Sequence, residues 1–96
     1  MIEKSGNRYS VTGPMLIADA RVLLESGRGF LLDEPGSEVI LDLASVEEVD
    51  SSALGVLFAL LRSARERGMT LRVANPPSSL ISLAGLYGVS DSLPLA

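Results

Sequence analysis

The sequence predicts a single α/β domain, in which helices pack on a small mixed β-sheet. A short apolar strand at residues 39–43 is followed by an amphipathic helix over 51–67 and by a second strand at 69–74. Strands joined through a helix run parallel, so this segment is a βαβ unit. An alternating strand precedes the unit and another helical segment follows it, so we expect one domain over residues 1–96.

Composition restricts the chemistry that the chain performs. Its 96 residues include no cysteine and no histidine, which removes thiol and imidazole catalysis, structural zinc and disulfides. The run Gly27-Arg28-Gly29 matches neither a Walker A loop nor a dinucleotide fingerprint. Glu47, Glu48 and Asp50 lack the pattern of a cation-binding loop and indicate a solvated turn. We therefore expect no catalytic residue, no metal, no cofactor and no enzymatic activity.

Charge and hydropathy restrict the partners. The net charge is −4 and lysine and arginine form no cluster, which argues against nucleic acid. The longest apolar run, Ala53 to Leu61, is far shorter than the roughly 20 residues of a spanning helix. The first ten residues lack a signal-peptide core. We expect a cytoplasmic protein that does not insert directly into a membrane.

The N-terminal part is predicted to contain strands and one helix. Apolar and polar residues alternate from Arg8 to Gly13, which predicts a half-exposed strand at a sheet edge. Residues 15–17 are candidates for a second short strand, and residues 18–32 for a helix. The glycines at 27 and 29 are expected to end or break that helix, and residues 33–37 form a turn.

The helix over 51–67 has two faces. Placed at about 100° per residue, the larger apolar side chains gather on an expected core face: Leu54, Leu57, Phe58, Leu61 and Ala64. The expected outer face begins with small residues: Ser52, Gly55, Val56 and Ala59. A glycine in a helix interior costs about 1 kcal/mol relative to alanine. Gly55 is therefore either a tolerated surface residue or a point of close approach by another backbone.

The C-terminal part follows the second strand of the βαβ unit. Residues 78–87 carry an amphipathic pattern with Ser78 or Ser79 as the cap and Gly88 as the stop. Residues 89–96 are expected to form a short final strand or an extended segment.

The polar residues Asp50, Ser51 and Ser52 are the candidate site. They begin the helix, where free N–H groups and the helix dipole favour an added phosphate on a hydroxyl. The alternative is that one of them is only the N-cap. Spacing alone leaves both interpretations open.

Three segments together resemble a STAS domain, the fold of the anti-sigma-factor antagonists. They are VILDL at 39–43, VDSSALGVL at 49–57 and RERGMTLRVANP at 65–76. The family's motif normally has glycine where Ala53 stands. The segment SLAGLYGV at 82–89, with Ser92-Leu93-Pro94 after it, is similar to the end of the STAS subunits of Mla phospholipid-trafficking ABC transporters.

The resemblance implies a non-catalytic interaction module with no cofactor. In the transporter branch, the hydroxyl residue after the aspartate, here Ser51, contacts the ABC transporter ATPase subunit at the cytoplasmic side of the inner membrane. In the antagonist branch, an anti-sigma-factor kinase phosphorylates a serine that corresponds to Ser51 or Ser52. The expected partner-binding residues are Asp50, Ser51, Ser52, Gly55, Val56 and Ala59. We expect the interface to extend to the loop 47–50 and the turn 75–78.

Overall fold

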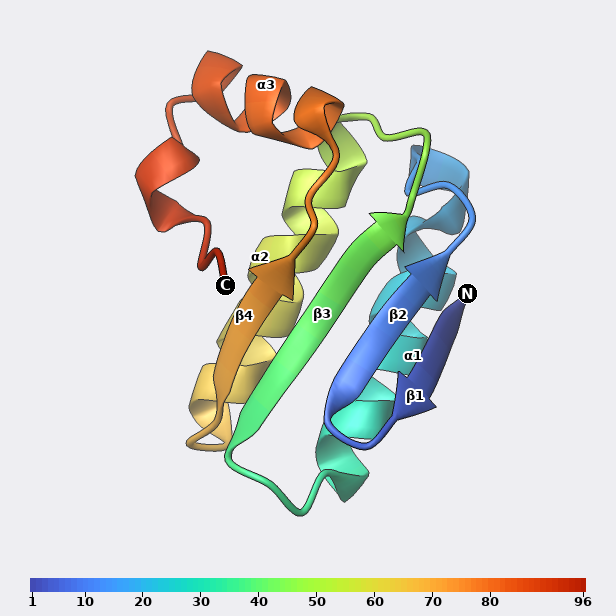
Figure 1. The fold of residues 1–96 in the computed structure, drawn as a ribbon, viewed down its shortest axis with the longest axis vertical. Helices are drawn as coiled ribbons and strands as arrows, with labels where there is room; N and C mark the ends of the chain where they lie inside the picture. The colour runs from blue at the N-terminus through green and yellow to red at the C-terminus, as the bar shows by residue number, and fades with distance from the viewer.

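A four-stranded mixed sheet organises the domain (Figure 1). The computed structural model describes all residues, 1–96. Its strands follow the order β1-β2-β3-β4 across the sheet. The strands are β1 (Ile2–Ser5), β2 (Arg8–Thr12), β3 (Glu38–Ser45) and β4 (Thr70–Ala74), and the α-helices are α1 (Ala20–Asp33), α2 (Ser51–Glu66) and α3 (Ser78–Leu86). The predicted α/β class and mixed sheet are confirmed.

The N-terminal hairpin corrects one expectation. β1 pairs antiparallel with β2, and β2 pairs in parallel with β3, so β2 is an interior strand and its predicted edge position is wrong. β1 forms the edge instead. A tight turn through Gly6, at φ 60°, joins the two strands. The sequence did not reveal β1 because only one apolar residue, Ile2, points to the core.

Residues 15–17 do not form the second short strand that the sequence predicted. Met15 makes an isolated parallel bridge with Val49, and a 3-10 turn begins at Ile17. The Met15 N–H donates to the Glu48 carbonyl (2.9 Å), and the Asp50 N–H donates to the Met15 carbonyl (3.3 Å). These bonds attach the segment after β2 to the loop that enters α2.

Helix α1 runs through both of its glycines, so the expected break is absent. Gly27 is buried against α2, and a Cβ at this position would lie 2.6 Å from Leu60 Cδ2. The Arg28 Nε also donates to the Ser63 Oγ of α2 (3.2 Å). Gly27 therefore serves the close packing of the two helices.

Helices α1 and α2 cover one face of the sheet, and α3 lies across the end toward which the parallel strands point (Figure 1). The core side chains of the sheet are Ile2, Tyr9, Val11, Val39, Leu41, Leu43, Leu71 and Val73. The other face of the sheet carries Arg8 and Asp42, whose Nε and Oδ2 atoms lie 3.0 Å apart. That face is polar and has no helix over it.

The buried face of α2 is broader than predicted and turned toward α1. Its buried residues are Ala53, Leu54, Val56, Leu57, Leu60 and Ala64. Val56 is only 5% exposed, so its predicted position on the outer face is wrong. It lies one turn before Leu60, on the side that α1 covers. Phe58 and Leu61, expected in the core, are only half-buried.

The C-terminal part matches the expected elements with two changes, at the cap of α3 and at residues 90–92. The N-cap of α3 is Pro77 and no side chain caps the helix, so neither Ser78 nor Ser79 is the cap. After α3 a 3-10 turn spans Ser90–Ser92. Leu95 then makes an isolated parallel bridge with Val73, which confirms an extended end beside β4.

Candidate protein-binding surface

Asp50 fixes the start of α2. Its Oδ1 accepts the Ser52 N–H (2.9 Å), which makes it the N-cap, and its Oδ2 accepts the Ile17 N–H (2.9 Å). The Ile17 N–H, with the backbone and hydroxyl of Ser52, holds the pKa of the Asp50 carboxyl below its usual value. Both carboxylate oxygens are therefore engaged within the chain. Asp50 positions this region, as the N-cap interpretation expected.

The two serines differ in accessibility. Ser51 is exposed, whereas Ser52 is half-buried. Ser51 stands at the rim of two adjoining hollows of about 560 and 270 Å³. Its side chain takes no part in the hydrogen bond that caps the helix. Ser51 is therefore the more accessible of the two hydroxyls.

Exposed apolar side chains lie beside Ser51. The end of α3 presents Leu86, which is 78% exposed, and the next residue, Tyr87, is 57% exposed. Ile17, held by its N–H bond to Asp50, is 73% exposed. We define the Ser51 surface as the residues that line the 560 Å³ hollow: Val49, Asp50, Ser51, Ser79, Ser82, Leu83, Leu86 and Tyr87. Clustered apolar residues on a surface are typical of a protein-interaction site.

The sequence did not point to the α3 side of this surface. Residues 78–87 carry apolar side chains around much of the helix, because Leu80 and Ala84 are buried while Ile81 and Leu86 are exposed. A helix that is apolar on more than one side has more apolar surface than its own core requires. That signal could have identified α3 as a second wall of the site.

Small residues continue the site along α2. Gly55 is exposed, and a Cβ added to it would have no heavy atom within 4 Å. Ala59, one turn further, is half-buried. No close approach within this chain requires the glycine. The structure thus leaves Ser52, Gly55 and Ala59 on the outer side of α2 and removes Val56 from it.

The turn after β4 is tied to the open face of the sheet. The Asn75 Nδ2 donates to Asp42 Oδ1 (3.1 Å), and Asn75 adopts φ 52°. The Asn75 amide, the Ala44 N–H and Arg8 together hold the pKa of the Asp42 carboxyl below its usual value. These contacts fix the turn that leads into α3 and so position one wall of the Ser51 surface.

Comparison with known proteins places this arrangement in a family. The family model described as "Mlab, STAS domain" matches residues 2–95. The chain is a STAS-domain protein of this family. A curated relative, the intermembrane phospholipid transport system binding protein MlaB of Haemophilus influenzae, is 34% identical over 50 residues. That match covers 52% of this chain and 48% of the relative, so it spans about half of each protein.

Solved structures share the STAS fold. A putative anti-sigma factor antagonist from Thermotoga maritima superimposes with a TM-score of 0.78 at 18% identity, covering 99% of this chain and 83% of that one. The Bacillus cell fate determinant SpoIIAA in its phosphorylated form gives 0.70 at 12% identity, covering 100% and 89%. At these identities the likeness shows the fold alone.

None of the helices in this STAS domain is both long and apolar enough to span a membrane.

Proposed function

We propose that this STAS domain is a non-catalytic subunit that binds and supports the ATPase of an Mla-type ABC transporter. Such a transporter maintains the lipid asymmetry of the outer membrane by phospholipid trafficking. The observation that carries the proposal is the exposed Ser51 beside the exposed apolar side chains of Leu86 and Tyr87. The match to MlaB, an intermembrane phospholipid transport system binding protein, supports the choice of partner.

The proposed contact assigns different roles to the residues at the start of α2. Asp50 holds the Ile17 segment and the first turn of α2 in position. Ser51, the small outer side of α2 and the end of α3 meet the partner directly. A stable interface buries about 800 Å² on each partner. The contact therefore extends beyond the hollows to the exposed side chains of Glu47 and Glu48, and to the turn 75–78.

The proposed location follows from the partner. An ATPase of an ABC transporter lies on the cytoplasmic side of the inner membrane, so the STAS domain is peripheral to that membrane through the ATPase. No direct insertion into the lipid is part of the proposal.

Copurification with the ATPase tests the proposal, with Ser51→Glu as the decisive variant. Ser51 is the first residue of α2, where a carboxylate is favoured by the helix dipole, so the variant keeps its fold. The new charge enters an apolar contact, and we expect the complex to be lost. The matched control is Ser37→Glu. Ser37 is also exposed, but it lies just before β3, at the end of that strand that is far from the start of α2.

Two outcomes decide the matter. Loss of the ATPase complex and of the lipid barrier with Ser51→Glu, but not with Ser37→Glu, supports the assignment. A Ser51→Glu variant that binds the ATPase and preserves the barrier contradicts the role of Ser51. Thermal unfolding of each variant distinguishes a lost contact from a lost fold.

The second candidate function is an anti-sigma-factor antagonist controlled by phosphorylation of Ser51 or Ser52. The fold likeness to the phosphorylated form of SpoIIAA favours it, as does an exposed hydroxyl at the start of a 16-residue helix. Incubation with the cognate anti-sigma-factor kinase and ATP, followed by intact-mass analysis, tests it. This function requires a phosphorylated species in stoichiometric yield, and an unmodified mass argues against it.

A further inference from the structure

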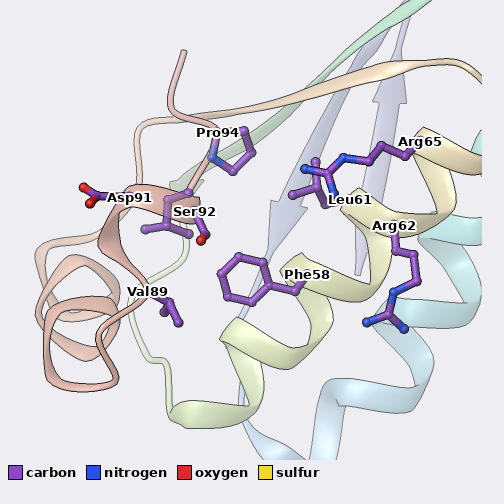
Figure 2. Close-up of a pocket in the computed structure, with 9 residues that line it drawn as sticks. Phe58, Leu61, Arg62, Arg65, Val89, Asp91, Ser92 and Pro94 are labelled. Carbon is purple, nitrogen blue, oxygen red and sulfur yellow. The ribbon is translucent and has the colours of Figure 1, made fainter.

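A third hollow opens between α2 and the C-terminal segment (Figure 2). Its volume is about 740 Å³, within the range of roughly 300–1,000 Å³ that is common for small-molecule sites. Its apolar lining consists of Phe58 and Leu61 from α2 and Val89, Leu93 and Pro94 from the C-terminal segment. Phe58 projects into the hollow between these walls (Figure 2). The half-buried state of Phe58 and Leu61, unexplained by the core, follows from this opening.

Positive charge lies on one side of the hollow. Arg62 and Arg65 are three residues apart and occupy neighbouring positions on α2. The Arg65 guanidinium extends beside Leu61 toward the hollow, whereas that of Arg62 is directed away from it (Figure 2). Neither arginine takes part in an ion pair of the chain. The Arg65 guanidinium therefore has N–H donors available at one end of the apolar lining of the hollow.

The opposite wall has a different character. Asp91 and Ser92 belong to the 3-10 turn after α3, and the Asp91 carboxylate points away from Phe58 (Figure 2). A negative charge near this turn is repelled, while one near Arg65 is attracted. An asymmetric ligand is thus oriented with its anionic end at Arg65 and its apolar part over Phe58.

We propose that this hollow binds an organic phosphate whose apolar body is a ring or a short chain. A guanidinium group matches phosphate oxygens with two parallel N–H donors, which favours a phosphate at Arg65. The Phe58 ring and the aliphatic lining accept the apolar body. The hollow adjoins the 270 Å³ hollow beside Ser51, because Phe58 and Val89 line both. Its arginine end is separate, because Ser51, Leu86 and Tyr87 do not line it.

Titration of the isolated chain, followed by backbone amide chemical shifts, tests the proposal. The probes are phenyl phosphate and hexyl phosphate. Inorganic phosphate, which is the anionic group alone, and hexanol, which carries the apolar chain without the phosphate, are the controls. We expect saturable shifts at Phe58, Leu61, Arg65 and Ser92 with at least one of the organic phosphates, and much weaker binding of either half alone. Tighter binding of phenyl phosphate identifies a ring-bearing ligand, and tighter binding of hexyl phosphate identifies a chain.

Charge-removing variants locate the phosphate. We expect Arg65→Gln to weaken binding about threefold to fivefold, the upper part of the range for a solvent-accessible charge pair, and Arg62→Gln to weaken it less. The control is Arg72→Gln, which removes the same charge from the opposite face of the sheet. Absence of saturable shifts with both organic phosphates, or equal affinity of Arg65→Gln and the unmodified chain, overturns the proposal. Neither result affects the ATPase contact, which copurification measures separately.

Discussion

Replacement of Gly55 by alanine separates the stability of the domain from its proposed binding. Gly55 lies inside α2 with an ordinary helical backbone, and a methyl group added to it meets no atom within 4 Å. Alanine is favoured over glycine in a helix by about 0.8–1.0 kcal/mol. We therefore expect Gly55→Ala to stabilise the isolated chain by nearly this amount, which corresponds to a Tm increase of about 4–8 °C for a domain of this size.

The same substitution is expected to weaken the partner contact. If the ATPase packs closely over the small residues of α2, the added methyl overfills the interface, at a typical cost of about 1–3 kcal/mol. Such a cost weakens binding about fivefold or more. Urea or thermal unfolding measures the first effect, and isothermal titration with the ATPase measures the second.

Gly29→Ala is the matched control for this experiment. Gly29 is exposed within α1, and its added methyl also meets nothing within 4 Å, so the gain in stability is the same. It lies outside the proposed contact, so binding is unchanged. A Gly55→Ala protein that binds as tightly as the Gly29→Ala protein refutes the close approach. A Gly55→Ala protein that loses stability refutes the description of an open helix surface.

Two further predictions concern the packing and the pH response. Gly27→Ala gains the same helix propensity but places its methyl 2.6 Å from Leu60 Cδ2, so we expect it to be less stable than Gly29→Ala by about 1–3 kcal/mol in urea unfolding; equal stabilities would contradict the tight α1–α2 contact. The pKa of Asp42 is lower in the folded chain than in the unfolded chain, where it is about 3.9, so the ionised carboxylate stabilises the fold above that pH. This stabilisation is lost as the pH falls through the pKa of the folded chain. Asp42→Asn should therefore lose less stability than the unmodified chain on acidification from about pH 5. Identical pH profiles would show that Asp42 is not held by its neighbours.

The elements that carry strong local signals could be predicted from sequence. The apolar run in β3, the capped start of α2 and the strand β4 follow one another at βαβ spacing, and the structure contains all three. β1 could not be predicted because it is held by its hairpin with β2 rather than by its own pattern. The position of β2 inside the sheet is a consequence of that hairpin.

The candidate site was only partly predictable. The N-cap role of Asp50 and the exposure of Ser51 depend on the first turn of α2, which the sequence marks clearly. The burial of Val56 depends on where α1 packs, which helix periodicity alone does not contain. The contribution of Leu86 depends on how α3 lies across the end of the sheet, and this tertiary placement has no local signature.

Hydrogen–deuterium exchange of the chain alone and in complex with the ATPase tests the central claim most directly. We predict that binding protects the amides at the start of α2 and at the end of α3, the two walls around Ser51. The amides of β1, at the far edge of the sheet, serve as the internal reference and should exchange equally in both samples. Protection confined to the sheet, with α2 and α3 unchanged, would contradict the account.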